Sequence, residues 1–153
     1  MSAFRRNKKG FTLIEVIVAI AIIAILASIV TVTIMAILRS QEKTSATKAL
    51  KSTWNNSNKA LKQLNTGLST YRAPSEAFLK IHLGTDKIAV GIKECVSLKN
   101  GYFYIQYADN PSSVRNRYTL VCIWYRYEDH YYYTTDGKKV IGPKNVNSNN
   151  ELL

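Results

Sequence analysis

The residues best suited to chemistry lie near the N-terminus, where a short basic stretch meets a long apolar run. Gly10 follows Lys8 and Lys9, Phe11 comes next, and Glu15 lies four residues beyond Phe11. Because Gly10 has no side chain, its backbone can extend freely and can be approached closely by another molecule. A carboxylate within an apolar helix, as at Glu15, costs free energy and usually serves a function. These residues are therefore the first candidate for a functional site.

Glu15 needs a partner for its charge. No basic residue lies within one helical turn after it, so we expect no structural role for its carboxylate within a single subunit. The alternative is a carboxylate that reaches the polar interface from near the helix end.

The other residues able to do chemistry form no recognisable centre. His82 and His130 lie in different segments, without cysteines or carboxylates at metal-ligand spacing. Asp129 precedes His130, but neighbouring residues of a strand point to opposite faces. The sequence contains no glycine-rich phosphate loop and no paired-carboxylate motif. We therefore expect no catalytic residue, no metal site and no cofactor.

Cys95 and Cys122 are the two cysteines of the chain. Their spacing matches no zinc motif, and no second pair is present to complete four ligands. If the C-terminal region is exported, a disulfide between them is expected, and it would contribute about 3–4 kcal/mol through loop closure. The alternative is two separate buried thiols.

A single long helix is predicted from about Phe11 to Asn65, ended by Gly67. Its first part contains no charged residue from Val16 to Leu38. This uncharged stretch is longer than the roughly 20 residues that a helix needs to cross a bilayer. In its second part, apolar residues recur at spacings of three, four or seven, which places them on one face that packs on a domain. They are Ala46, Leu50, Trp54, Leu61 and Leu64.

The remainder of the chain is predicted to form a small domain. Ser75 is a candidate cap for a short helix that ends at Leu83. Strand-like runs follow, rich in β-branched and aromatic residues: Ile88–Ile92, Tyr102–Tyr107, Tyr118–Tyr127 and Tyr131–Thr134. Asp136–Gly137 predicts a hairpin from the last of these to 138–141, and the Asn-rich tail from Pro143 is expected to fray.

The expected fold class is therefore α+β, with a long N-terminal helix packed on a small C-terminal antiparallel sheet. Three parts are expected: a leader at 1–10, a membrane and assembly helix at 11–38, and an extracytoplasmic globular domain at 39–153.

Residues 5–38 resemble the prepilin leader and N-methylation motif of type IV pilins, type II secretion pseudopilins and competence pseudopilins. The resemblance is carried by Lys8, Lys9, Gly10 and Phe11, by Glu15, and by the apolar helix that follows. It implies that a prepilin peptidase cuts after Gly10 and methylates the new amine of Phe11. It also implies that Glu15 directs assembly, by pairing with that amine on a neighbouring subunit.

The partners implied by this resemblance are the prepilin peptidase, other pilin subunits, and an assembly platform with its ATPase. The chain would be a single-pass membrane protein before assembly and part of a cell-surface filament afterwards. One departure from many pilus-building pilins is that residues 11–38 contain neither proline nor glycine.

The leading hypothesis is thus a structural subunit, a major or minor pilin, and not an enzyme. One alternative is a type II secretion pseudopilin, and another is a competence-type minor pilin that binds DNA. The chain is basic, with 21 Lys and Arg against 10 Asp and Glu, and several of its ten tyrosines alternate with Arg115, Arg117 and Arg126. Such residues can bind single-stranded nucleic acid, but cross-strand packing explains them better. A third possibility is an ordinary membrane anchor that is never cleaved.

Overall fold

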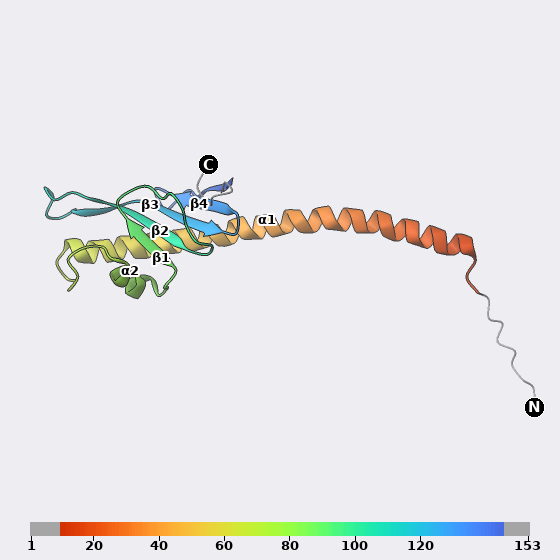
Figure 1. Ribbon diagram of the computed structural model, residues 1–153, viewed down its shortest axis with the longest axis horizontal. Coiled ribbons are helices and arrows are strands. Elements are labelled where there is room, and N and C mark those ends of the chain that lie inside the picture. Colours follow the sequence, from red (N-terminus) through yellow and green to blue (C-terminus); the bar gives the residue numbers. More distant parts are fainter. Residues whose placement is uncertain (1–9, 146–153) are drawn as a thin grey trace, which may run out of the picture. The chain divides into compact units, whose positions relative to one another are not determined.

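A computed structural model describes residues 10–145 of the chain. It divides into two compact units, Met1–Gln41 and Glu42–Leu153. Helix α1, Leu13–Asn65, has 53 residues and belongs to both units (Figure 1). This confirms the single long helix, and Gly67 follows its end with a left-handed φ of 70°.

The first unit consists of the apolar part of α1. Its most apolar 18-residue window has a mean hydropathy of 3.0, so this helix is long and apolar enough to cross a membrane by length and composition. The hydroxyls of Ser28, Thr31 and Thr33 donate to backbone carbonyls one turn earlier, at 2.6–3.0 Å. These bonds satisfy the polar side chains inside the helix itself, as an apolar surrounding requires. The expected membrane bounds of 11–38 stay a prediction.

The second unit contains the rest of α1, a short helix and a five-stranded sheet. The additional elements are α2 (Glu76–Leu83), β1 (Ile88–Gly91), β2 (Phe103–Asp109), β3 (Tyr118–Tyr127), β4 (His130–Thr134) and β5 (Ile141–Asn145). The Ser75 hydroxyl accepts a 3.2 Å hydrogen bond from the Phe78 amide and caps α2, as predicted. Gly84 ends α2 with a left-handed φ of 65°.

The strands lie in the order β1-β2-β3-β4-β5. Neighbours from β2 to β5 are antiparallel, as expected. The first pair differs, because β1 runs parallel to β2. The connection at 92–102 returns the chain to the end of the sheet from which β1 started, and a tight hairpin could not do so.

The hairpin predicted at Asp136–Gly137 joins β4 to β5, which confirms it. The second strand begins later than expected, because Oδ1 of Asp136 accepts hydrogen bonds from the amides of Lys138 and Lys139 and holds them in the turn. Strand β5 also continues through Pro143 to Asn145, so the expectation of fraying from Pro143 is wrong for these three residues. The tail beyond them lies outside the described residues.

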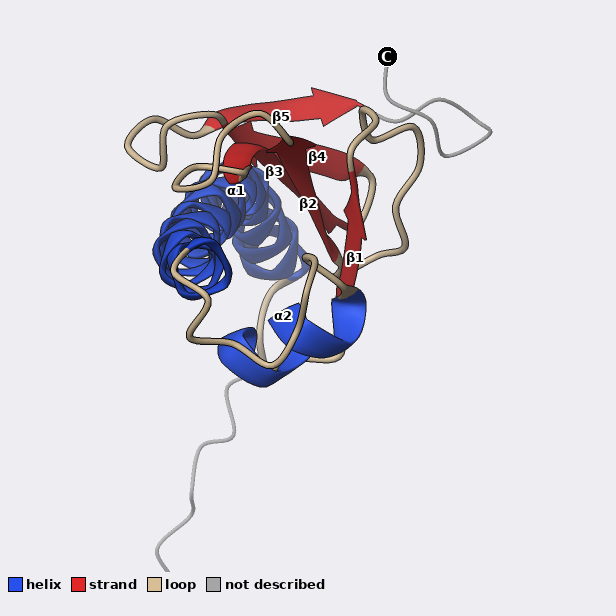
Figure 2. Cartoon of the chain, turned by 90° about the vertical axis from the view of Figure 1, so that its left-hand side faces the viewer, coloured by secondary structure: helices blue, strands red, loops and turns tan. Residues whose placement is uncertain are grey.

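The main core lies between the sheet and the C-terminal half of α1 (Figure 2). Leu50 and Trp54 of α1 are buried there together with Phe78 and Leu79 of α2 and with Ile105 of the sheet. The apolar face predicted for the second part of α1 is confirmed, because Ala46 and Leu61 are also buried and Leu64 is half-buried against the same cluster. This core fixes the sheet to α1 through apolar burial, about 25 cal/mol for each Å² removed from water.

Candidate functional site

The predicted cleavage site lies just before α1 begins. Gly10 and Phe11 are exposed, and the Phe11 side chain keeps 88% of its accessible surface. A Cβ added to Gly10 would meet no atom within 4 Å. The Gly10–Phe11 peptide bond is therefore accessible, and both residues precede the helical hydrogen bonding that starts at Leu13. Lys8 and Lys9 lie outside the described residues.

Glu15 makes a reciprocal cap at the start of α1. Its Oε2 accepts hydrogen bonds from the amide of Thr12 at 2.8 Å and from the hydroxyl of Thr12 at 2.9 Å. The Glu15 amide in turn donates to the Thr12 hydroxyl at 3.4 Å. This is a capping box, which satisfies amide groups that the first helical turn leaves without partners.

The expectation that Glu15 has no structural role within one subunit is therefore wrong. The capping box needs only a threonine and a glutamate three residues apart, and both are visible in the sequence. A basic partner is not needed, because the carboxylate is bonded by the helix terminus itself.

The surface around Glu15 is apolar. A shallow depression of about 310 Å³ is lined by Glu15 together with Ile14, Val18, Ala19 and Ile22. All five residues are exposed in the isolated chain. In an apolar surrounding, a cation beside this carboxylate would be screened far less than in water.

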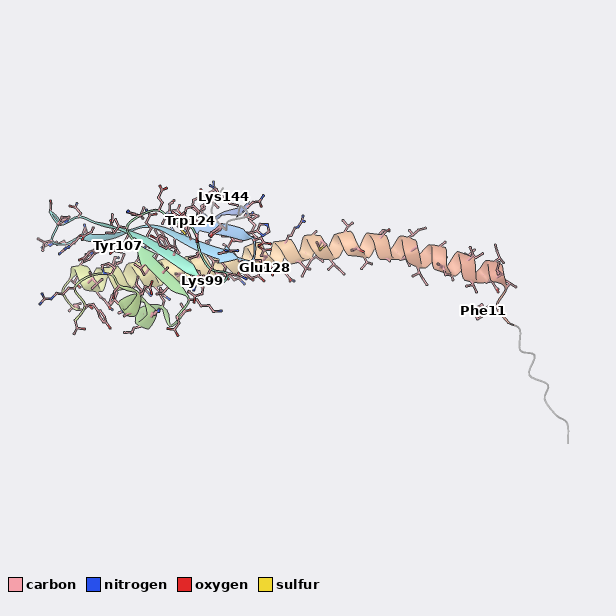
Figure 3. All side chains as sticks on the ribbon, in the orientation of Figure 1. Phe11, Lys99, Tyr107, Trp124, Glu128 and Lys144 are labelled. Carbon is pink, nitrogen blue, oxygen red and sulfur yellow. The ribbon has the colours of Figure 1, made fainter. Side chains whose placement is uncertain are left out.

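The two cysteines lie near the face of the sheet that is turned away from α1. Cys95 belongs to a second buried cluster with Leu98 and Tyr131, against which Trp124 also packs. Cys122 is a buried residue of β3, paired with Gln106. Figure 3 labels Trp124 on this sheet, with Lys144 on β5.

Both thiols are free in the structure. Burial raises the pKa of Cys95 to about 11. It raises the pKa of Cys122 to about 12, and the negative charge of a Cys95 thiolate adds to this effect. Such thiols are protonated at neutral pH and react slowly, which is typical of structural cysteines. The predicted disulfide stays a prediction.

The loop at 92–101 is fastened over the second cluster by hydrogen bonds from the sheet. The amide of Leu98 donates to the hydroxyl of Tyr131 at 2.8 Å, and the carbonyl of Leu98 accepts from Arg126 at 2.8 Å. The hydroxyl of Tyr104 donates to the carbonyl of Lys93 at 2.8 Å. These contacts hold the loop, and with it Cys95, in a fixed position on the sheet.

The two histidines lie on different elements, His82 in α2 and His130 in β4. Nδ1 of His82 contacts the carbonyl of Phe78 at 2.9 Å, and its Nε2 contacts Oε1 of Gln63 at 2.8 Å. His130 lies 3.6 Å from Glu42. Within residues 10–145, no group of three or more His, Cys, Asp or Glu side chains is arranged to hold a metal ion.

The tyrosines serve mainly as packing residues. Tyr118 and Tyr131 are buried, and the ring of Tyr125 stacks on Phe103 at 4.5 Å. Two of the interleaved arginines also have partners in the domain: Arg117 pairs with Asp109, and Arg126 donates to the carbonyls of Leu98 and Glu128. The cross-strand packing interpretation therefore accounts for this part of the sequence.

Comparison with protein families matches residues 5–31 to the prokaryotic N-terminal methylation motif. This motif is the leader of type IV pilins and pseudopilins, and it supports a type IV pilin-like or pseudopilin protein. The matched residues include Gly10, Phe11 and Glu15 and extend into the apolar part of α1. No curated protein and no solved structure matches the chain.

Proposed function

We propose that this chain is the precursor of a structural subunit of a type IV pilus or a pilus-like filament, matured by a prepilin peptidase. The observation that carries the proposal is the methylation motif at residues 5–31, followed by a 53-residue helix whose first part is apolar. The chain has the two parts that such a subunit needs: an apolar helix for a membrane or a filament interior, and a folded domain to display.

Maturation would begin at the exposed peptide bond between Gly10 and Phe11. The peptidase hydrolyses this bond, releases the leader 1–10 and leaves a free amine on Phe11, which is then methylated. The capping box between Thr12 and Glu15 lies entirely after the cut. It can therefore hold the start of α1 in shape both before and after cleavage.

Glu15 can act both within a subunit and between subunits. Its Oε2 accepts both bonds from Thr12, while its Oε1 has no hydrogen-bond partner among the described residues. We infer that Oε1 accepts a hydrogen bond from the N-terminal amine of Phe11 of a neighbouring subunit. In the precursor this nitrogen is part of an uncharged peptide bond. The pair between Glu15 and the Phe11 amine therefore forms only after cleavage. It would set the axial register between subunits in an apolar surrounding, where charges are little screened.

The remaining parts of the proposal follow from this assembly. The precursor would be held in the membrane by the apolar part of α1, and an assembly platform with its ATPase would add it to other pilin subunits. The mature chain would then be part of a filament at the cell surface, and the domain from residue 39 onward would face outward.

N-terminal sequencing and intact-mass measurement of the membrane-bound protein test the proposal. The mature chain should begin at a methylated Phe11 when a prepilin peptidase is present, and at the original N-terminus when the peptidase is absent. Gly10→Leu should leave uncut precursor in the membrane, since a branched side chain obstructs the peptidase groove. Glu15→Ala serves as the matched control and should still be cut. Wild-type protein that keeps its leader beside an active peptidase would overturn the proposal.

A further inference from the structure

Helix α1 begins close to the bond that the peptidase would cut. Gly10, Phe11 and Thr12 are not helical, and α1 starts at Leu13. Figure 3 labels Phe11 just before the first turn of the helix. The amide of Val16 donates to the carbonyl of Thr12 at 3.3 Å. Among the described residues, no helical hydrogen bond reaches the carbonyl of Gly10 or Phe11.

The apolar run by itself does not fix this boundary. In an apolar surrounding a helix gains by extending, because each amide left without a partner costs free energy. Extension toward the N-terminus would bond the Glu15 amide to the carbonyl of Phe11 and draw Phe11 into the helix. Glycine disfavours a helix at position 10, but Phe11 and Thr12 carry no such restriction. Another feature must therefore end the helix at Leu13.

The capping box occupies the groups that a longer helix would use. The Glu15 amide donates to the hydroxyl of Thr12 at 3.4 Å, in place of the carbonyl of Phe11. The Thr12 amide donates to Oε2 of Glu15 at 2.8 Å, in place of a carbonyl of the leader. The Thr12 hydroxyl donates to the same oxygen at 2.9 Å. Because a residue in the capping position is not helical, these bonds stop the helix directly after Phe11.

We propose that Thr12 is a positioning residue for maturation, which keeps the Gly10–Phe11 bond outside α1 and open to the peptidase. This inference rests on the proposed function, since it concerns the same cut. A peptidase reaches a backbone that is exposed and free of regular hydrogen bonds more readily than a helical one. Thr12 takes no part in the hydrolysis and acts only through the conformation of Phe11.

The positioning role predicts a specific kinetic change. A precursor whose cleavage site is helical for part of the time binds the peptidase more weakly, in proportion to the fraction that remains competent. Once the competent form is bound, the chemical step is the same. Loss of the cap should therefore raise KM and leave kcat unchanged. An N-cap shifts such a balance about fivefold, which sets the largest expected rise in KM.

The test measures initial rates of leader release from the full-length precursor in detergent micelles, with purified prepilin peptidase. Thr12→Val removes the hydroxyl at nearly constant volume and should raise KM up to about fivefold at unchanged kcat. Thr12→Ser restores a capping hydroxyl and should return KM to the parent value. The matched control is Thr31→Val, which removes a hydroxyl bonded to the carbonyl of Ala27 within the same helix. It should keep the kinetics of the parent.

Variants of Glu15 separate the bonds of the cap from the charge of the carboxylate. The side-chain oxygen of glutamine can complete a capping box, so Glu15→Gln should keep KM near the parent value. Glu15→Ala cannot complete it and should raise KM as Thr12→Val does. Glu15→Ala is still cut in cells, because the expected change slows the cut and does not prevent it. A rise in KM in Glu15→Gln as large as in Glu15→Ala would overturn the proposal.

NMR chemical shifts of Phe11 in the micelle-bound precursor report the helix boundary without the peptidase. They should be non-helical in the parent and move toward helical values in Thr12→Val. A parent that is cut while Thr12→Val keeps both its KM and its Phe11 shifts would overturn this inference alone. A rise in KM that Thr12→Ser does not reverse would do so too. A parent that is not cut by an active peptidase would overturn the proposed function, and this inference with it.

Discussion

The hydroxyl of Tyr132 donates a 2.7 Å hydrogen bond to Oε1 of Glu42, which joins β4 to α1 across 90 residues of sequence. Burial raises the pKa of Tyr132, and the hydrogen bond to Glu42 and the negative charge of Glu42 raise it further. The phenol therefore stays protonated, and remains a hydrogen-bond donor, throughout the physiological pH range. Nδ1 of His130 lies 3.6 Å from the same oxygen. Glu42, which receives both contacts, is the first residue of the second compact unit.

Tyr132→Phe should lower the free energy of unfolding by about 1–3 kcal/mol, because it leaves a half-buried carboxylate without its donor. Urea unfolding followed by circular dichroism measures this change. The matched control is Tyr125→Phe, which faces Tyr132 across the strands and whose hydroxyl makes no hydrogen bond among the described residues. In a Glu42→Gln background the cost of Tyr132→Phe should shrink, and equal costs in both backgrounds would rule out the coupling.

Gly137 has a φ of 69°, and a Cβ added there would lie 2.1 Å from Cδ1 of Trp54. Gly137→Ala should therefore cost about 2–4 kcal/mol, from backbone strain together with overpacking against the indole. Gly67→Ala is the matched control, because Gly67 has a φ of 70° and open space around it. It should cost about 1–2 kcal/mol, the strain alone.

Trp54→Ala alone should cost about 3–5 kcal/mol. In that background the cost of Gly137→Ala should fall to that of Gly67→Ala, since the indole is gone. Thermal or urea unfolding of the double variant checks this. A cost at Gly137 that is the same with and without the indole would contradict the packing argument.

Asp136 should contribute to stability above about pH 4 and lose that contribution in acid. Hydrogen bonds from the amides of Lys139 and Lys138 hold its pKa below the ordinary 3.8. Because the folded state binds the proton less well than the unfolded state, stability falls as the pH drops through the folded pKa. Asp136→Asn should flatten the acid limb of the curve of urea midpoint against pH, between about pH 5 and 2. If the acid limb of Asp136→Asn has the same slope as that of the parent protein, the Asp136 carboxylate does not make this contribution to stability.

The cysteine prediction concerns protein recovered from outside the cell. We expect a Cys95–Cys122 disulfide there, seen as a mass lower by two hydrogens and as no alkylation after unfolding without reductant. In the reduced protein, both thiols should resist iodoacetamide at neutral pH until the domain unfolds, because burial raises the pKa of both. Exported protein that is fully alkylated after unfolding, with no reductant added, would exclude the disulfide.

Glu15→Ala should be inserted and cut after Gly10 but should enter filaments poorly, and Glu15→Asp should be intermediate because its arm is shorter. The measurement compares sheared surface filaments with the membrane pool. Thr12→Val separates the two roles of Glu15, since it removes the hydroxyl of the cap and keeps the carboxylate. If the role between subunits dominates, Thr12→Val should assemble nearly normally. A normal filament yield from Glu15→Ala would show that the carboxylate does not direct assembly.

Much of the architecture follows from local sequence. The uninterrupted apolar run, the face formed by Leu50 and Trp54, the Ser75 cap and the Asp136–Gly137 turn each depend on residues within a few positions of one another. The structure has all four. The capping box of Thr12 and Glu15 is equally local, because it needs only a threonine and a glutamate three residues apart.

Other features depend on which segments become neighbours, and the order of residues along the chain does not specify that. Three features join residues far apart in sequence: the parallel pairing of β1 with β2, the bond from Tyr131 to the loop that carries Cys95, and the bond from Tyr132 to Glu42. The methylation motif at residues 5–31 and the apolar run of α1 are thus visible in the sequence alone, because each is a continuous segment. The surroundings of the cysteines are decided by tertiary structure. So is the meeting of Lys62 with Arg115 beside one depression, because packing of the sheet on α1 brings the helix end and the β2–β3 loop together.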